Sequence, residues 1–325
     1  MAAPRLTRNR PRVVAIVGAT ASGKSALGVA LARRLGGEVV SCDSTAVYRG
    51  FDIGTDKLPP SQRRGVPHHL VDVVEPTERY SAARYARAAA TAVRDISRRG
   101  RLPIVVGGSG LYYRALTRGL FPGPGRDDAL RGRLARVARR RGLHCLRRAL
   151  ARIDPESAER IQPRDEKRLI RALEVFRLTG RPLTEHFART RSPLADYAVS
   201  GFAIRLPSAD TARRVEARVE AQFAAGLLEE VRAALAAGLP EDAHPLGGLV
   251  YRQVIEHLRG ERDERATREL IVRENLRYAR RQLIWFRKEP NLRWIRVPGE
   301  HRDALPAVLG SLVDVEPTQA DVEPR

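Results

Sequence analysis

The sequence predicts an α/β fold in which a parallel sheet is flanked by helices and the chain carries an inserted helical domain. Three observations support this prediction: a glycine-rich loop directly after an apolar run, two further apolar runs separated by helical patterns, and a basic helical stretch in mid-chain. Strands that alternate with helices form parallel sheets, because each helix returns the chain to the same edge. The 325 residues and 43% hydrophobic content suffice for such a core.

The first apolar run, Val13–Val17, leads into the motif G-x-x-x-x-G-K-S. Small residues let successive backbone N–H groups point into one concavity, and the following helix adds the positive end of its dipole. Lys24 adds a full charge, and the Ser25 hydroxyl can ligate a Mg²⁺ that also contacts phosphate oxygens. The motif therefore predicts a P-loop NTPase-like sheet that binds polyphosphate. The predicted phosphate-binding residues are Gly18, Ala19, Thr20, Ala21, Ser22, Gly23, Lys24 and Ser25.

Two further apolar runs, Glu38–Cys42 and Leu102–Val106, end next to polar residues. Ligands of parallel sheets lie beyond the carboxyl ends of the strands, so we expect Asp43 and Ser109 to meet the phosphate loop. Asp43 can bind a metal or take a proton. The glycines around Ser109 form a turn without other side chains, which presents the Ser109 hydroxyl as a hydrogen-bond donor. In a common ATPase an acid ends this strand, so glycines there weaken a hydrolase interpretation.

The middle of the chain predicts a helical insertion over residues 126–194. Residues 126–191 hold 19 Lys and Arg against 9 Asp and Glu, a net charge of 19 − 9 = +10. A strand-like segment, Phe202–Leu206, resumes the sheet and is followed by helical patterns over 210–237 and 264–288. The predicted organisation is a catalytic core of residues 13–125 and 195–300, with a basic disordered tail at 1–12 and a flexible tail at 301–325.

Charge, cysteine content and the length of the apolar runs favour a nucleic-acid-binding protein over a secreted or membrane protein. The formal charge of +21, from 59 Lys and Arg against 38 Asp and Glu, favours a nucleic-acid partner, although genome bias also enriches arginine. Cys42 and Cys145 are too few for a disulfide framework and fit a reducing cytoplasm. No apolar run is long enough for a membrane span, so neither secretion nor membrane insertion is expected. Adjacent His68 and His69 point apart on an extended segment, which disfavours a metal site.

Several motifs together resemble one known family, tRNA dimethylallyltransferase, over nearly the whole chain. The motifs are Gly18–Ser25, Asp43-Ser44 with Tyr48–Thr55, Pro67–Asp72, Gly107–Tyr112, Asp154-Pro155, Ile161–Asp165, Arg171–Val175 and Tyr278–Gln282 with Trp285–Arg287. The resemblance implies transfer of a dimethylallyl group from dimethylallyl diphosphate, held with Mg²⁺, to N6 of adenosine 37 in tRNAs that read codons beginning with U. It also implies an adenine flipped from the anticodon loop into a channel.

The resemblance assigns roles to individual residues. Asp43 would accept the N6 proton, Ser109, where the family usually has threonine, would bond the bridging oxygen, and Arg218 would stabilise the departing diphosphate. Ser25 would ligate the metal. The implied tRNA-binding residues are Asp43, Ser44, Thr45, Ala46, Ser109, Arg131, Lys167, Arg168, Leu169, Ile170, Arg171, Tyr251 and Arg252. Departures from the family pattern at Ala46, Val250, Asn275 and Leu276 bear on tRNA recognition.

Three other interpretations stay open. A small-molecule kinase would use the phosphate loop for ATP, and an adenylate isopentenyltransferase would use AMP as the acceptor. The basic insertion argues against the second, because a mononucleotide needs no extended basic surface. A non-catalytic RNA-binding protein would tolerate loss of Asp43, which is present. A monomer is expected.

Overall fold

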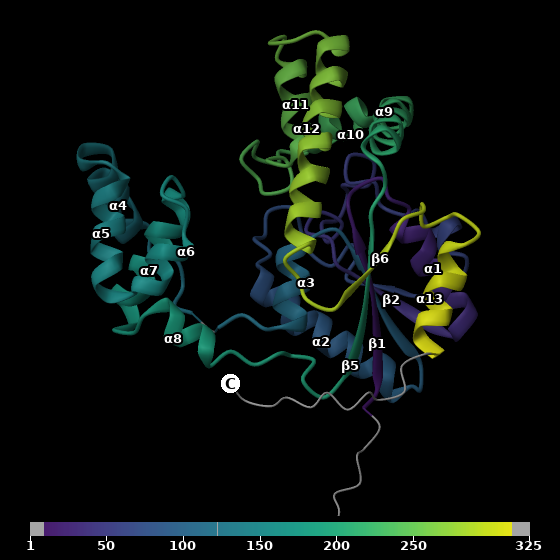
Figure 1. Ribbon diagram of the computed structural model, residues 1–325. Coiled ribbons are helices and arrows are strands. Elements are labelled where there is room, and N and C mark those ends of the chain that lie inside the picture. The colour runs from purple at the N-terminus through teal and green to yellow at the C-terminus, as the bar shows by residue number, and fades with distance from the viewer. Residues whose placement is uncertain (1–9, 122, 314–325) are drawn as a thin grey trace, which may run out of the picture. The chain divides into compact units, whose positions relative to one another are not determined.

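The computed structural model describes residues 10–121 and 123–313 (Figure 1). The chain divides into two compact units, a helical unit of Arg118–Pro193 and a core unit formed by the rest. The predicted insertion, residues 126–194, lies almost wholly within the helical unit. Each unit is described by itself below.

The core unit is built on one parallel sheet of six strands in the order β3-β2-β4-β1-β5-β6. The predicted parallel α/β fold is confirmed, and each of the four predicted strands overlaps an observed one. The sheet consists of β1 (Arg12–Gly18), β2 (Gly37–Ser41), β3 (His68–His69), β4 (Leu102–Gly107), β5 (Ala198–Ile204) and β6 (Leu292–Ile295).

Both faces of this sheet are covered, which explains the uninterrupted apolar runs. Side chains alternate between faces along β1: Val14 and Ile16 pack with α1 (Lys24–Leu35) and α13 (Ala304–Val313), whereas Val13, Ala15 and Val17 belong to the opposite core. That second core is closed by α2 (Ala82–Arg98), α3 (Gly110–Thr117), α9 (Ser208–Ala224), α10 (Leu227–Ala236), α11 (Leu249–Leu258) and α12 (Glu264–Phe286). A short 3₁₀ helix, η1 (Pro60–Arg63), lies in the loop before β3.

The helical unit has its own apolar core, in which Leu146, Leu150, Leu169 and Val175 are buried. The Asp154 carboxylate organises its connections, because it accepts bonds from the backbone N–H of Ser157 and from the backbone and side chain of Thr184. Its helices are α4 (Asp128–Arg141), α5 (Leu143–Ile153), α6 (Pro155–Arg160), α7 (Glu166–Thr179) and α8 (Leu183–Ala188).

Three sequence-based boundaries are wrong. The predicted flexible tail begins with an ordered segment, because Ala304, Val308 and Leu312 recur on one face of α13 and are buried in the core. Residues 314–325 lie outside the described residues, as do residues 1–9 of the predicted N-terminal tail. Arg12 is part of β1 and pairs with Ala198. The helical pattern over 210–237 is two helices, separated where Gly226 adopts a left-handed conformation.

Within residues 10–121 and 123–313, no helix is both long and apolar enough to span a bilayer.

Candidate active site

The phosphate loop forms as the sequence predicts, between β1 and the first turn of α1. Gly23 is the N-cap of α1 with φ of 82°, a left-handed conformation that favours glycine. Lys24 and Ser25 then begin the helix. This arrangement points the amino terminus of a twelve-residue helix at the loop, where its dipole favours an anion.

The carboxyl ends of β2 and β4 bring the other two predicted loops together. The Ser109 backbone N–H donates to the carbonyl of Cys42 at 3.1 Å. The Ser109 hydroxyl oxygen accepts from the Ser44 backbone N–H at 2.9 Å and donates to the Ser44 hydroxyl at 3.2 Å. Ser109 is buried. Its hydroxyl therefore stands in a fixed position beside Asp43.

The Asp43 carboxylate is held through one of its oxygens. Oδ1 accepts from the Thr45 backbone N–H at 2.9 Å, the Thr45 hydroxyl at 2.7 Å and the Ala46 backbone N–H at 3.4 Å. No hydrogen bond from the described residues reaches Oδ2. The local turn thus orients the carboxylate and leaves its second oxygen available to take a proton.

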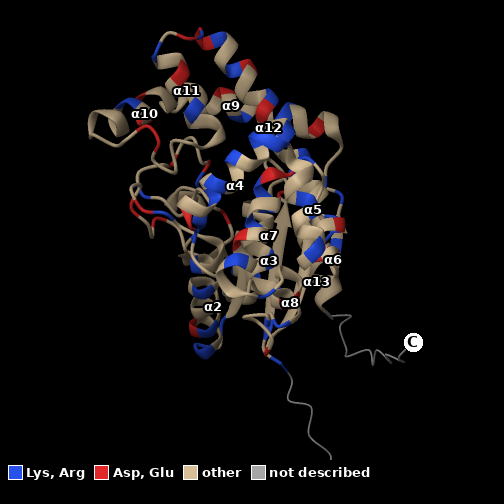
Figure 2. Ribbon diagram, turned by 90° about the vertical axis from the view of Figure 1, so that its left-hand side faces the viewer, with Lys and Arg blue, Asp and Glu red and all other residues tan. Residues whose placement is uncertain are grey.

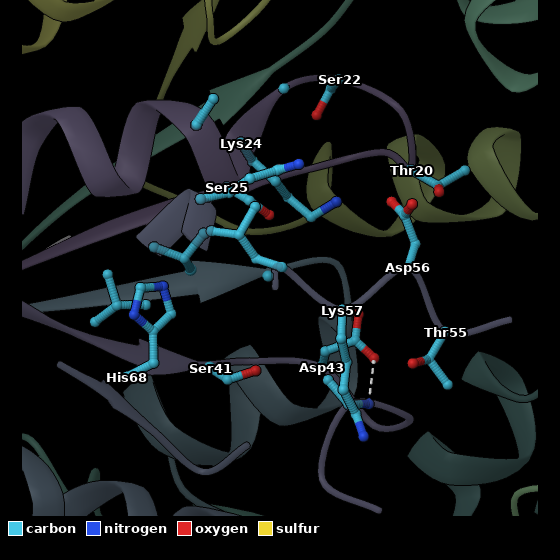
Figure 3. Close-up of a pocket in the computed structure, with 18 of the residues that line it drawn as sticks. Thr20, Ser22, Lys24, Ser25, Ser41, Asp43, Thr55, Asp56, Lys57 and His68 are labelled. Carbon is cyan, nitrogen blue, oxygen red and sulfur yellow. Dashed lines mark hydrogen bonds between the residues drawn. The ribbon is translucent and has the colours of Figure 1, made fainter. Parts of the chain in front are cut away.

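A cavity of about 480 Å³ is lined by Asp43 and by residues 20–25 of the phosphate loop. Figure 3 shows that Lys24, Asp43 and Asp56 lie around the cavity and come from three different segments of the chain. The same cavity is lined by Arg214 and Arg218 from α9 and by much of the phosphate loop. The structure therefore brings the predicted base, the predicted phosphate lysine and the predicted leaving-group arginine into one site.

Two arginines one turn apart on α9 approach the phosphate loop. Arg218 donates to the Thr20 hydroxyl at 2.5 Å and pairs with Asp56 at 3.0 Å. Arg214 donates to the Ala21 carbonyl at 2.6 Å and pairs with Glu300. Both guanidinium groups are held by carboxylates, so an incoming polyphosphate meets cations that are already positioned.

Burial has a strong effect on Lys24. It lowers the pKa of this amine to about 8, and the neighbouring charge of Arg218 acts in the same direction, against smaller opposing contributions from Asp43 and Asp56. The positive charges of Lys24 and Arg218 are therefore not fully balanced by the nearby carboxylates. A bound polyphosphate would supply the missing negative charge.

We therefore expect the affinity for inorganic diphosphate to fall as the pH rises through about 8. Below this pH the ammonium of Lys24 attracts the anion, and above it the amine is neutral, so the affinity should drop by up to about tenfold per pH unit. Calorimetric titration at several pH values measures this. Lys24→Arg is the control, because arginine stays charged and reports only the ionisation of the ligand. Parallel pH profiles for the two proteins would contradict the expectation.

The loop that carries Asp56 is supported from α10 and α11. Glu230 accepts hydrogen bonds from the backbone N–H groups of residues 52, 53 and 54, and from the hydroxyl of Tyr251 at 2.6 Å. Tyr251 is only 2% exposed. The hydroxyl of Tyr251 is therefore committed to Glu230, and the RNA contact implied for this residue stays a prediction. Arg252, the next residue, is exposed.

Within the helical unit, the predicted RNA-binding residues fall into three groups. Arg131 and Arg171 both bond to Glu174, a fully buried carboxylate, and these arginines hold its pKa at about 2. Leu169 and Ile170 are buried in the apolar core of the helical unit, and the RNA contacts implied for them stay predictions. Lys167 and Arg168 are exposed at the start of α7, and Figure 2 shows Lys and Arg along α4, α5 and α7.

The departures from the family pattern have different surroundings. Ala46 lines the cavity, so its small side chain enlarges the space beside Asp43. Val250 and Leu276 pack in the apolar core, and Asn275 donates to the carbonyl of Ile271. Only the change at Ala46 alters the wall of the site.

The adjacent side chains of His68 and His69 contact different groups. His69 bonds to Glu38 at 2.7 Å, whereas His68 lines the cavity and bonds to the carbonyl of Val66. No group of three or more His, Cys, Asp or Glu among the described residues is arranged to hold a metal ion.

Sequence reasoning missed three members of this region: Asp56, Glu300 and Gln282. Asp56 follows directly after the motif Tyr48–Thr55. Glu300 lies at the end of the predicted core, and the backbone N–H of Gly299 donates to the carbonyl of Ser22. Gln282 lies at the end of the motif Tyr278–Gln282, to which the resemblance to the family assigned no function.

Comparisons with known proteins agree with this geometry. Residues 46–289 match the family model described as IPP transferase. A tRNA dimethylallyltransferase of Geobacter metallireducens is 44% identical over 93% of this chain and 97% of its own length. One from Anaeromyxobacter dehalogenans is 48% identical, over 88% and 95%. The solved structure of a full-length tRNA isopentenylpyrophosphate transferase from Bacillus halodurans has a TM-score of 0.69 and 34% identity, over 94% of this chain and 96% of that one.

Proposed function

Because this chain belongs to the IPP transferase family, we propose that it is a tRNA dimethylallyltransferase. The proposed reaction transfers the dimethylallyl group of dimethylallyl diphosphate to N6 of adenosine 37 in tRNAs that read codons beginning with U. The observation that supports it best is the cavity lined by both the phosphate loop and the held carboxylate of Asp43, with the buried hydroxyl of Ser109 bonded to the neighbouring Ser44.

The donor diphosphate would lie in the phosphate loop. Residues 20–25 of the loop, which include Lys24, and the two arginines of α9 line the cavity at this place. Charge builds on the diphosphate as the bond between C1 of the allyl group and the bridging oxygen breaks. Cations fixed beforehand stabilise that charge more than solvent does, since they need no reorganisation.

The acceptor amine would approach beside Asp43. The lone pair of N6 forms the new bond to C1 while the electron pair of the breaking bond leaves with diphosphate. The N6 proton passes to Oδ2 of Asp43, the oxygen that the described residues leave without a hydrogen bond. Ser109 would turn its hydroxyl hydrogen from Ser44 toward the bridging oxygen.

The residues present fit a Mg²⁺ ion bound together with the donor. Ser25 lines the cavity at the start of α1, where its hydroxyl supplies a hard oxygen ligand. The described residues provide no carboxylate cluster, and Mg²⁺ typically keeps waters and phosphate oxygens as its other ligands. When bound, the ion neutralises charge on the diphosphate.

The helical unit would hold the anticodon stem. Its excess of positive charge and the exposed Lys167 and Arg168 favour contacts with the phosphate backbone. A tRNA substrate is also consistent with the cytoplasmic location expected from the sequence.

We expect the double variant Lys167→Ala/Arg168→Ala to bind an anticodon stem-loop about tenfold more weakly, with a salt dependence reduced by about two released counterions. Donor affinity should not change. Fluorescence anisotropy over a range of salt concentrations measures both quantities. Arg148→Ala/Arg152→Ala, two exposed arginines of α5, removes the same charge from another helix. Equal losses in the two variants would show that only net charge matters.

The activity itself is tested by transfer of label from dimethylallyl diphosphate, with Mg²⁺, to a stem-loop that contains adenosines at positions 36, 37 and 38. We expect label on adenosine 37 alone. Label on AMP would identify an adenylate isopentenyltransferase, and ATP turnover without transfer would identify a kinase. Either result would overturn the proposal.

A further inference from the structure

One side chain of α12 reaches two loops of the site at once. Gln282 accepts a hydrogen bond from the backbone N–H of Thr20, in the phosphate loop, at 2.8 Å. It donates to the backbone carbonyl of Gly108, in the turn that carries Ser109, at 2.9 Å. The side chain is 6% exposed. A single buried amide therefore bridges the ends of β1 and β4.

The chemistry of this bridge requires an amide. Its partners are a backbone N–H, which only donates, and a backbone carbonyl, which only accepts. The carboxamide satisfies both with its oxygen toward Thr20 and its nitrogen toward Gly108. A carboxylate offers no donor to Gly108, and an apolar side chain leaves two backbone groups without a partner.

The bridge ends at a junction in the phosphate loop. The backbone N–H of Thr20 is committed to Gln282, and the hydroxyl of the same residue accepts from Arg218. The N–H of Thr20 is therefore not available to a ligand bound in the loop. Gln282 and Arg218 together fix the residue at which the loop turns.

The Ser109 turn is held on its other sides as well. It is tied to the segment after β2 by the bonds of Ser109 to Cys42 and Ser44. Trp285, one turn further along α12, packs against Gly110 so closely that an added Cβ would lie 2.2 Å from its Cδ1. Gly108 has the same restriction, since its Cβ would lie 2.3 Å from the nitrogen of Gln282. Helix α12 thus fits the turn closely.

We propose that Gln282 is a positioning residue that sets the distance between the phosphate loop and the hydroxyl of Ser109. The inference rests on the proposed function, because the distance matters only if Ser109 bonds a leaving group held by the loop. Gln282 touches neither substrate in this account. It acts through the two backbone groups that it joins.

The first test replaces Gln282 with leucine. We expect the single-turnover rate of prenyl transfer, at saturating donor, to fall about 100-fold, while donor affinity changes less than about fivefold, because a displaced reacting group costs rate more than binding. The matched control is Gln253→Leu, which removes a 3% exposed glutamine of α11 that bonds to Arg262. The control should lose similar thermal stability and keep its rate within about twofold.

The second test is a double-mutant cycle with Ser109→Ala. If Gln282 acts by placing this hydroxyl, Gln282→Leu should slow the Ser109→Ala enzyme by less than about fivefold. An unchanged factor of about 100 in that background would overturn the inference. So would a Gln282→Leu enzyme that behaves like Gln253→Leu. A wild-type protein that transfers no prenyl group would instead refute the proposed function.

A third variant, Gln282→Glu, separates positioning from general loss of structure. A protonated carboxylic acid can accept from Thr20 and donate to Gly108, whereas the ionised form cannot donate. The rate of this variant relative to wild type should therefore rise as the pH falls. A ratio that stays constant with pH would contradict the assigned hydrogen bonds.

Discussion

The Asp43→Asn enzyme is expected to transfer the dimethylallyl group about 10²–10⁴-fold more slowly than wild type, with donor affinity nearly unchanged. Asparagine keeps an oxygen that accepts from the backbone N–H groups of Thr45 and Ala46, so the turn after β2 retains its shape. It cannot take the N6 proton. Single-turnover rates with saturating RNA and donor measure the loss, and calorimetry measures donor binding.

A further observation makes this test decisive. Because Asn preserves the turn, the melting temperature should match wild type, which separates lost chemistry from lost folding. A variant with a near-normal rate would remove Asp43 as the base.

The second large effect concerns Lys24. Lys24→Met should lower kcat/KM for the donor by about 10³-fold, because the site loses a full charge at the atoms where negative charge develops. The same change should raise the free energy of unfolding of the ligand-free protein at neutral pH by about 2–3 kcal/mol. The reason is that burial lowers the pKa of this amine from 10.5 to about 8, so the folded protein holds a charge that is better solvated when unfolded.

Opposite signs for activity and stability make the Lys24 prediction specific. Chemical denaturation gives the stability change, and steady-state kinetics gives the loss of activity. Inorganic diphosphate should raise the melting temperature of wild type and have little effect on Lys24→Met. If the variant were less stable than wild type, the ammonium of Lys24 would have to be paired in the ligand-free protein.

The parts of the site that the sequence predicted are those encoded locally. The phosphate loop is contiguous from Gly18 to Ser25, and its spacing alone predicts a polyphosphate-binding site. Asp43 and Ser109 follow apolar runs, and the rule that strand ends of a parallel sheet converge placed them correctly. These inferences need only the pattern of apolar runs along the chain and the parallel arrangement of the strands that the runs form.

The parts that escaped prediction depend on pairing between distant residues. Gln282 lies 262 positions from Thr20, and its partners are backbone groups that any residue possesses. The bond from the hydroxyl of Tyr251 to Glu230 was also not predicted. Arg131 and Arg171 were predicted only as RNA-binding residues, because no sequence pattern reveals that both converge on Glu174.

The position of β5 in the sheet bears on the order in which the protein is made. Strand β1 lies between β4 and β5, but β5 begins only at Ala198, after the whole helical unit has been synthesised. During translation the helical unit therefore leaves the ribosome while one edge of β1 still lacks its neighbour. An unpaired edge of a strand whose residues 13–17 are all apolar invites association with other chains. The edge of β1 stays unpaired until β5 is made. We therefore expect the growing chain to need a chaperone most while the residues between 117 and 198 are being synthesised.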